Sequence, residues 1–301
     1  MEPIQIIRVG NTLGEGVQWD ALGQALWWTD IQERKLYRYD WARQALESFS
    51  APERVGSFGL IQGRSEIIAA FESGFALFDP RSGAQKWLAR PDAAIAGLRF
   101  NDGRVDRQGR FWAGTMDETE PRSARANLYC VDAAGRAVKR ESGIMISNGI
   151  CWSPDSKRFY FADSPLQKMY CYDFDPLTGA IANRRVFAET TGNAHPDGAC
   201  VDAQGYLWSA QWGAGQVARY APDGTIERIL KVPASQPTCV AFGGPDLDLL
   251  FVTCARDGLT AGQLAHEPSA GDVFVYKMGC IGLAENHFVL DMGRRRDVEP
   301  P

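Results

Sequence analysis

The amino-acid sequence predicts an all-β protein, a six-bladed β-propeller with four antiparallel strands in each blade. Three observations lead to this prediction. A hairpin of two apolar strands recurs six times along the 301 residues. The copies follow one another every roughly 40–50 residues, which is the spacing of propeller blades. No stretch has the period of a long amphipathic helix, and the 31 glycines are spread through the predicted turns.

Each copy consists of a polar phrase, an apolar strand, a turn and a second apolar strand. The six copies begin at Gly14, Ser57, Asn101, Ser147, Asn193 and Pro237. The fifth copy, residues 193–210, is the clearest, since Pro196-Asp197-Gly198 leads into an apolar run, a turn and a second apolar run. An amphipathic pair of strands follows most copies, as at residues 35–40 and 45–49. Hairpin and pair together give the four strands of one blade.

The ends of the chain are expected to close the ring. Residues 272–276 predict the third strand of the last blade, and either residues 4–9 or residues 287–290 supply its outermost strand. Closure by an N-terminal strand would remove exposed sheet edges. No linker interrupts the repeat, so we expect one domain spanning residues 1–301. A β-sandwich followed by a second domain is the alternative, and it leaves the even period unexplained.

Composition narrows the class of protein and of partner. Hydrophobic residues make up 45% and charged residues 23%, as in ordinary soluble globular proteins. The net charge of −5 argues against nucleic acid or an anionic membrane as partner. No apolar run approaches the ~20 residues that a membrane span needs. We therefore expect a small-molecule ligand, no nucleic-acid partner, no membrane partner and a monomeric protein.

The cysteines and the N-terminal residues indicate the compartment. The seven cysteines are odd in number and scattered, and no CxxC pair occurs among them. This pattern fits a reducing cytosol better than a disulfide framework, and it offers no thiolate metal site. The first residues lack the basic region and apolar core of a signal peptide. We expect a cytoplasmic protein.

Polar residues recur where the first strand of each blade begins. First strands line the channel of a propeller, so these residues should gather at one mouth: Glu15, Asn101, Asn148 and Asp197, with Ser57 and Thr238 from the remaining blades. Any one of them alone would be interpreted as a turn residue. Glu15, Asn148 and Asp197, however, occupy one register in three blades, and each is followed by glycine. Two carboxylates and one amide predict an oxygen-ligand site for a divalent cation.

Loops between the second and third strands should open onto the same mouth. They bring Asp30, Met116-Asp117-Glu118, Asp163-Ser164, Gln211-Trp212 and Arg256-Asp257. The longest of them, residues 117–127, is either a lid over the pocket or an ordinary solvated loop. Arg99 is the cation expected to face this acidic mouth, where it would bind ligand oxygens or pair with a carboxylate. His195 is interpreted as a bystander beside Asp197.

The chain resembles the regucalcin (senescence marker protein)/gluconolactonase family of sugar lactone hydrolases. The resemblance covers nearly the whole chain and rests on the segments Leu13-Gly14-Glu15-Gly16, Arg99-Phe100-Asn101-Asp102-Gly103, Ala113-Gly114-Thr115-Met116, Ile146-Ser147-Asn148-Gly149, Pro196-Asp197-Gly198 and Val252-Thr253-Cys254-Ala255-Arg256-Asp257-Gly258. It implies a six-bladed propeller with one catalytic divalent ion in the mouth. The implied metal ligands are Glu15, Asn148 and Asp197, and Asp197 would double as the catalytic base.

The resemblance also implies that Arg99 and Asn101 contact the substrate, with Glu118 as a further contact. The implied reaction is the opening of an aldonolactone, of the gluconolactone type, to its aldonic acid. A divalent ion would polarise the lactone carbonyl while Asp197 activates water. The ion could be calcium, zinc, magnesium, manganese or iron(II). The alternatives are a related propeller hydrolase for an organophosphate or other ester, and a calcium-binding regulator without turnover.

Overall fold

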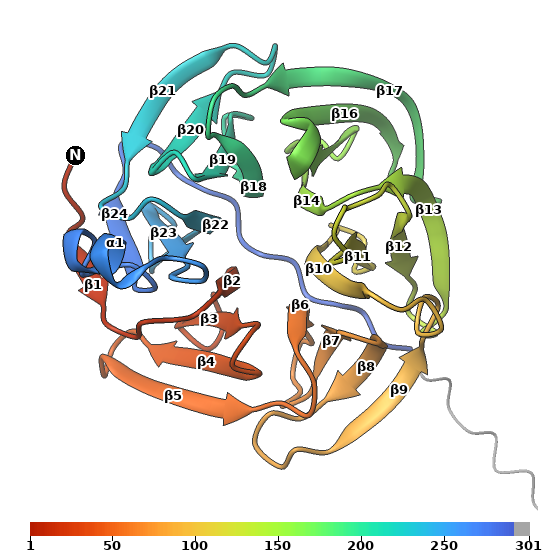
Figure 1. The fold of residues 1–301 in the computed structure, drawn as a ribbon. Helices are drawn as coiled ribbons and strands as arrows, with labels where there is room; N and C mark the ends of the chain where they lie inside the picture. The colour runs from red at the N-terminus through yellow and green to blue at the C-terminus, as the bar shows by residue number, and fades with distance from the viewer. Residues whose placement is uncertain (292–301) are drawn as a thin grey trace, which may run out of the picture.

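Six four-stranded antiparallel sheets stand around a central channel like the blades of a propeller (Figure 1). This computed structural model describes residues 1–291, and the predicted fold is confirmed. The last ten residues of the predicted single domain, 292–301, lie outside the described residues, so that boundary stays a prediction. Among residues 1–291, no helix combines the length and the apolar character needed to cross a bilayer.

Strands succeed one another from the channel outward in the first three blades. Blade 1 contains β2 (Gly14–Asp20), β3 (Ala25–Asp30), β4 (Lys35–Asp40) and β5 (Ala45–Ser50). Blade 2 contains β6 (Val55–Leu60), β7 (Ile67–Phe71), β8 (Gly74–Phe78) and β9 (Gln85–Ala89). Blade 3 contains β10 (Leu98–Val105), β11 (Phe111–Asp117), β12 (Ala126–Val131) and β13 (Ala137–Ile144).

The next three blades follow the same plan, except that the last one borrows its outer strand from the start of the chain. Blade 4 contains β14 (Ser147–Trp152), β15 (Arg158–Asp163), β16 (Lys168–Asp175) and β17 (Ala180–Glu189), with the 3-10 turn η1 (Ser164–Leu166) after β15. Blade 5 contains β18 (His195–Val201), β19 (Leu207–Trp212), β20 (Gln216–Tyr220) and β21 (Ile226–Lys231). Blade 6 contains β22 (Pro237–Gly243), β23 (Leu249–Cys254), β24 (Val273–Lys277) and β1 (Gln5–Ile7), and α1 (Ala261–His266) precedes β24.

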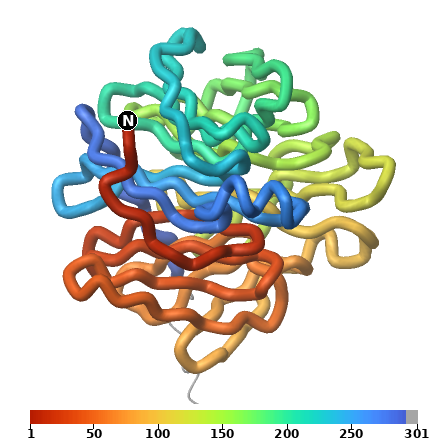
Figure 2. Tube along the Cα trace, turned by 60° about the vertical axis from the view of Figure 1, so that its left-hand side comes forward, coloured from red at the N-terminus to blue at the C-terminus, as the bar shows by residue number. Residues whose placement is uncertain are grey.

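The N-terminal strand β1 closes the ring. Gln5 pairs with Val275 and Ile7 with Val273 in antiparallel register, and Figure 2 shows the red N-terminal segment beside the blue strands of the last blade. Of the two alternatives predicted for the outermost strand, residues 4–9 are therefore the right one. Residues 287–290 lie elsewhere, because Phe288 forms a parallel bridge with Ile61 of blade 2.

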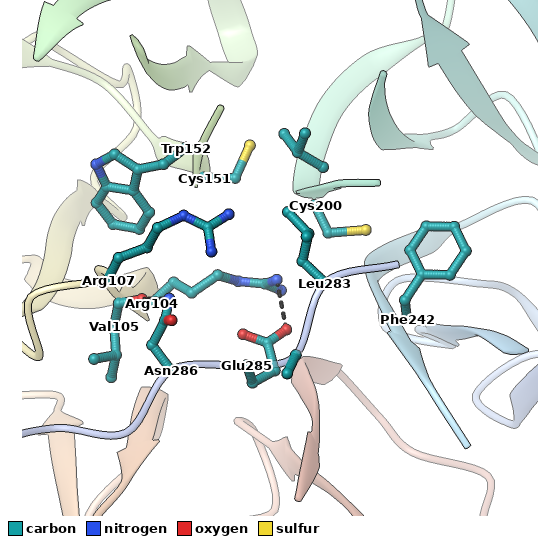
Figure 3. A pocket seen from close by; sticks show the side chains of 12 residues that line it. Arg104, Val105, Arg107, Cys151, Trp152, Cys200, Phe242, Leu283, Glu285 and Asn286 are labelled. Atoms are coloured by element: carbon teal, nitrogen blue, oxygen red, sulfur yellow. Dashed lines mark hydrogen bonds and ion pairs between the residues drawn. The ribbon is translucent and has the colours of Figure 1, made fainter. Parts of the chain in front are cut away.

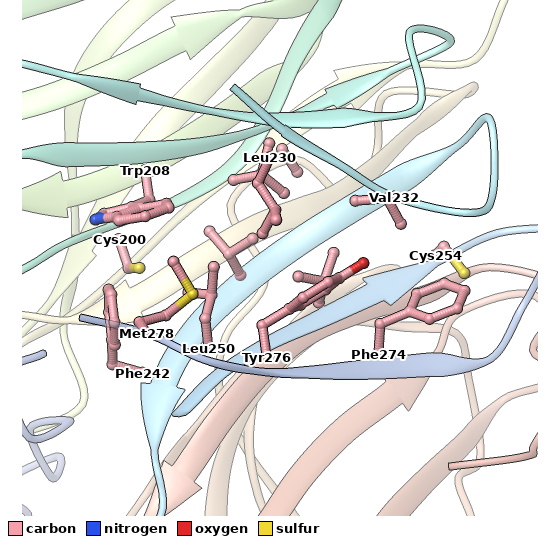
Figure 4. Packing of buried hydrophobic residues seen from close by; sticks show 14 of the residues in the cluster. Cys200, Trp208, Leu230, Val232, Phe242, Leu250, Cys254, Phe274, Tyr276 and Met278 are labelled. Carbon is pink, nitrogen blue, oxygen red and sulfur yellow. The ribbon is translucent and has the colours of Figure 1, made fainter. Parts of the chain in front are cut away.

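Apolar side chains fill every interface between neighbouring blades. Six buried clusters occupy the six interfaces, each drawing residues from two adjacent blades. Between blades 5 and 6, for example, Trp208 meets Phe242 edge to face with ring centroids 5.7 Å apart (Figure 4). Sheets that are covered on both faces pack in this way, which explains why the first two strands of each blade are buried over almost their whole length. The outermost strands are exposed and amphipathic, as β5 illustrates.

The inner strands share one irregularity that matters for the site. All six of them shift register against their neighbour near their first residues, and the shift follows Glu15 in β2, Asn148 in β14 and Pro196 in β18. A bulge redirects the side chain beside it. Gly16 and Gly149 adopt φ values of +60° and +67°, which glycine reaches without strain. The glycines that follow Glu15 and Asn148 thus permit the bulges that aim these side chains.

Residues 279–291, here called the crossing segment, lie across the end of the channel where the inner strands end. The segment runs through the centre of the ring in Figure 1 and hydrogen-bonds to Leu247 of blade 6, Leu60 of blade 2 and Gly109 of blade 3. Its Glu285 accepts a 2.8 Å hydrogen bond from Arg104 of β10 (Figure 3). Only a gap of about 40 Å³ remains beside this ion pair.

Candidate active site

The predicted site residues meet in one cavity at the end of the channel where the inner strands begin. The cavity has a volume of about 530 Å³, which is sufficient for a small sugar. Its lining includes all six residues expected to bind metal or substrate or to act in catalysis, Glu15, Arg99, Asn101, Glu118, Asn148 and Asp197. Leu13, Met116, Ile146 and Trp212 supply apolar wall. The structure therefore brings the predicted residues together, while their individual roles remain predictions.

Asp197 and Asn148 are oriented by a short hydrogen-bond chain. Ser164 donates to the carbonyl oxygen of Pro196 at 2.6 Å, and its hydroxyl oxygen accepts from Nδ2 of Asn148 at 2.8 Å. Because the amide nitrogen is used there, the amide oxygen of Asn148 faces the other way. Asp197 is only 6% exposed, and its Oδ1 is buried without a hydrogen-bond partner among the described residues. A buried carboxylate oxygen without a partner is costly unless a ligand satisfies it.

The carboxyl groups of Glu15 and Asp197 both have raised pKa values, because each is buried close to another negative charge. Burial, followed by the nearby carboxylate of Asp102, raises the pKa of Glu15 to about 8. Burial, followed by the charge of Glu15, raises the pKa of Asp197 well above its ordinary value. Both effects arise from placing negative charges together away from water. A bound divalent cation would relieve them, and such strongly perturbed carboxyl groups are common at functional sites.

A divalent metal ion bound by Glu15 and Asp197 would need the amide oxygen of Asn148 as a third protein ligand. Within residues 1–291, no group of three or more histidine, cysteine, aspartate or glutamate side chains is arranged to hold a metal ion. The candidate set therefore consists of two carboxylates and one amide oxygen. Oxygen ligands of this kind suit hard cations such as calcium or magnesium. The donor chemistry and the unpartnered oxygen of Asp197 both fit a divalent ion.

Arg99 and Asn101 are connected to this ligand set. Arg99 donates from Nη1 to Oδ1 of Asn101 at 2.8 Å, and Asn101 donates from Nδ2 to Oδ1 of Asn148 at 3.0 Å. Arg99 also donates from Nε to Glu118 at 2.8 Å. Its second terminal nitrogen, Nη2, makes no hydrogen bond within residues 1–291. Arg99 thus fixes the side chain of Asn101, which in turn contacts Asn148, and its Nη2 group is still available to a ligand.

Glu118 is held between two guanidinium groups. Arg54, which the sequence analysis missed, donates to both of its carboxylate oxygens at 2.9 and 2.7 Å and also forms two hydrogen bonds to Glu72. Burial opposes ionisation of Glu118, but the hydrogen bonds from Arg54 and Arg99 prevail and lower its pKa. Glu118 therefore stays ionised. The only sequence signal for Arg54 is its place directly before β6, comparable to that of Arg99 near the start of β10.

The loop between β11 and β12, residues 118–125, is folded around the carboxylate of Asp117. That carboxylate accepts hydrogen bonds from Thr119, Ser123 and Arg125, and the bond from Arg125 is the first cause of its lowered pKa. Arg122 of this loop lines the cavity. This loop thus has an ordered internal structure and contributes a side chain that the sequence pattern did not indicate. The sequence predicts it to be the longest loop at the mouth, but the connection between β23 and β24, residues 255–272, is longer and contributes Asp257 to the cavity.

Other residues expected at the mouth have structural contacts. Asp30 accepts from the backbone N–H groups of residues 12 and 13, and Asp163 accepts from those of residues 145 and 146, so both fasten the approach to an inner strand. Ser57 and Thr238 are buried in inner strands and do not line the cavity. His195 does line it, with Nδ1 3.2 Å from the carbonyl oxygen of Ser164.

Comparison with known proteins places the chain among sugar lactone hydrolases and their relatives. Residues 13–256 match the model of the family described as SMP-30/Gluconolactonase/LRE-like region. The 6-deoxy-6-sulfogluconolactonase of Pseudomonas putida is 38% identical over 94% of this chain and 97% of its own length. The L-arabinolactonase of Azospirillum brasilense is also 38% identical, over 92% of each chain.

A solved structure agrees with this relationship. The calcium-binding protein regucalcin from Agrobacterium tumefaciens superimposes with a TM-score of 0.90 at 31% identity, covering 96% of this chain and 98% of that one. The relatives are similar along almost the whole chain, so the match includes the strands that carry the cavity. The chain therefore belongs to the SMP-30/gluconolactonase/LRE-like family, and the prediction of an enzyme of the lactonase class is confirmed at this level.

Proposed function

We propose that this protein is a metal-dependent sugar lactonase that opens an aldonolactone to its aldonic acid. One observation carries the proposal: two carboxylates and an amide from three blades meet at the floor of a sugar-sized cavity, where Oδ1 of Asp197 has no partner among the described residues. Two relatives are named as lactonases that act on different sugar lactones. Their shared substrate class supports a sugar lactone here.

Glu15, Asn148 and Asp197 are the proposed ligands of one divalent ion. When bound, such an ion polarises a lactone carbonyl and stabilises the negative charge that develops on its oxygen. The ion would be calcium, zinc, magnesium, manganese or iron(II), since all of them accept oxygen ligands. In the proposed arrangement Asn101 orients the amide oxygen of Asn148 through their 3.0 Å hydrogen bond.

Asp197 is the proposed base. One of its carboxylate oxygens accepts a proton from the water that attacks the lactone carbonyl carbon, while the new carbon–oxygen bond forms. The ring carbon–oxygen bond then breaks, and the proton returns from Asp197 to the ring oxygen, which becomes a hydroxyl group of the product acid. Arg99, Asn101 and Glu118 are the proposed contacts to the substrate hydroxyls. Nη2 of Arg99 is a spare donor and ionised Glu118 an acceptor for that purpose.

The test compares Asp197→Asn with Glu15→Gln. Both variants remove one ligand charge, but only the first removes the proposed base. At saturating metal, with occupancy measured by calorimetry, Asp197→Asn should stay on the order of 10²–10⁴ slower than the parent protein. Glu15→Gln should recover much more of its rate. Hydrolysis of a panel of sugar lactones is followed with a pH indicator, after chelation and after metal is added back.

Two results would contradict the proposal. Full lactonase activity in chelator-treated, metal-free protein would remove the metal from the mechanism. Equal recovery of the two variants at saturation would leave Asp197 as a ligand without a role as base.

A calcium-binding protein without turnover is the second candidate. The observation that favours it is the similarity to regucalcin, which is described as a calcium-binding protein. Calcium binding at Glu15, Asn148 and Asp197 with no hydrolysis of any lactone in the panel would support this candidate. Turnover of an organophosphate or another ester in place of the lactones would instead indicate a related propeller hydrolase.

A further inference from the structure

Arg122 lines the cavity, and most of its hydrogen-bond donors have no acceptor among the described residues. Its Nε donates to the carbonyl oxygen of Asp117 at 2.7 Å, and this bond fixes the base of the guanidinium group. Neither terminal nitrogen makes a hydrogen bond to any described residue. The nearest carboxylate is that of Glu120, 3.6 Å away, and the Glu120 side chain is 78% exposed. An exposed pair at this distance is worth little.

The other cations near the cavity are neutralised. Arg54 and Arg99 form a closed network with Glu72 and Glu118, in which every member is hydrogen-bonded to an opposite charge. Two positive and two negative charges cancel within that network. Arg122 lies outside it. Its guanidinium therefore keeps both terminal nitrogens for a ligand, whereas Arg99 keeps only Nη2.

The remaining carboxylate of the cavity rim lies on the other side. Asp257 follows β23 of blade 6, and in a ring of six blades this blade stands opposite blade 3. Asp257 accepts a 3.0 Å hydrogen bond from Gln32. Glu15 and Asp197 lie at the floor of the cavity, near the starts of inner strands. A ligand that reaches from the floor toward the blade 3 rim thus ends at a positive charge.

The position of Arg122 is set before any ligand arrives. Its loop is fastened by the hydrogen bonds to the Asp117 carboxylate, and Arg125 adds a 2.9 Å bond to the carbonyl oxygen of Ala96. A preformed donor loses less conformational entropy on binding than a mobile one. The planar fork of a guanidinium suits a carboxylate, sulfonate or phosphate group, which accepts two parallel hydrogen bonds.

We propose that Arg122 is a specificity-determining residue that binds an anionic group on the substrate, a carboxylate or a sulfonate at the end of the sugar remote from the lactone carbonyl. The proposal deepens the proposed function and rests on it. It assigns the carbonyl end of the substrate to the floor with Asp197 and the anionic end to the rim with Arg122. Acidic sugar lactones would then be preferred to neutral ones.

The test measures kcat/KM of the metal-loaded protein for three lactones of one sugar. One is neutral gluconolactone, one carries a sulfonate at C6, and one carries a carboxylate at C6. Arg122→Ala should lower the ratio of acidic to neutral kcat/KM by about 10- to 100-fold, the effect of one hydrogen bond to a charged group. The loss should appear mainly in KM, and Arg122→Lys should restore part of it because the charge returns.

Arg125→Ala is the matched control. Arg125 belongs to the same loop and contacts the same Asp117, but it does not line the cavity. The acidic-to-neutral ratio should stay unchanged in this variant. An equal fall in both variants would show that the order of the loop matters and the charge of Arg122 does not, which would overturn the proposal. A parent protein without any preference for acidic lactones would overturn it as well.

Calorimetry separates this proposal from the proposed function. The sulfonate-bearing and carboxylate-bearing product acids should bind the parent protein about 10- to 100-fold more tightly than they bind Arg122→Ala. Weakening of one acid alone identifies the anionic group that the site prefers. If no lactone is hydrolysed, the proposed function fails, and the calorimetric comparison still decides the role of Arg122. Equal binding to parent and variant would refute it.

Discussion

Replacing Glu15 by glutamine should make the metal-free protein more stable, most clearly at high pH. The Glu15 carboxyl group is buried, and its pKa lies at about 8 rather than at its ordinary 4.5. Between these two values the folded protein keeps a proton that the unfolded chain has lost. Stability contributed by this group is therefore highest at low pH and is lost as the pH rises through this window. Glutamine has nearly the same shape and no charge to desolvate.

The size of the effect follows from the same numbers. A pKa difference of this size corresponds to at most about 5 kcal/mol of destabilisation once Glu15 is ionised. Part of the repulsion is carried by the neighbouring carboxyl group, because the charge of Glu15 raises the pKa of Asp197 and Asp197 then stays protonated to higher pH. Protein relaxation and water lower the cost further. We expect Glu15→Gln to gain about 1–3 kcal/mol near pH 9 and much less near pH 5.

Urea unfolding in the presence of a chelator measures this difference between about pH 5 and pH 9. Glu189→Gln, which changes an exposed glutamate on β17, is the control for the loss of one negative charge. Parallel pH profiles for the parent protein and Glu15→Gln would refute the reasoning. Added metal should reverse the order of stability, because a ligand that binds only the folded state stabilises most the protein that binds it best.

Two further predictions concern structural carboxylates. Asp202→Ala should destabilise the protein by about 3–5 kcal/mol in urea unfolding, because the buried Asp202 carboxylate accepts hydrogen bonds from Arg219, Trp208 and two backbone N–H groups. A loss below about 1 kcal/mol would contradict this role. Glu285→Gln should lower the free energy of unfolding by about 3 kcal/mol, because it leaves the buried Arg104 without its charged partner. The double variant Arg104→Met/Glu285→Leu should recover much of that stability, and an equally unstable double variant would argue against the ion pair as the cause.

The repeat made most of the fold predictable. Alternating turns and apolar hairpins specify the inner two strands of every blade locally, and the observed β2 and β14 begin at Gly14 and Ser147, where the first and fourth copies begin. The same repetition predicted which residues share a level of the channel. Glu15, Asn148 and Asp197 could therefore be grouped across three blades without knowledge of any distance.

Features that depend on distant contacts were not predictable. Residues 4–9 and 287–290 are both short and apolar, and only the assembled ring decides which of them pairs with β24. The crossing segment has no strand or helix period, because it is held by single hydrogen bonds to several blades. Arg54 reaches Glu118 from a loop, and Arg122 lines the cavity from another loop. The conformation of the Arg122 loop is set by hydrogen bonds to Asp117, which the order of its residues did not reveal.

The pairing of β1 with β24 determines the order in which the protein can finish folding. β1 precedes every other strand in the chain, and its partner is the last strand to be synthesised. Each of the first five blades can form its hairpins from neighbouring segments, whereas the sixth must wait for two segments separated by nearly the whole chain. Contacts of such separation carry the largest loop-closure entropy and form slowly. Until they form, β24 presents an open edge to other chains, so this late step is the stage at which the protein is most exposed to misassembly.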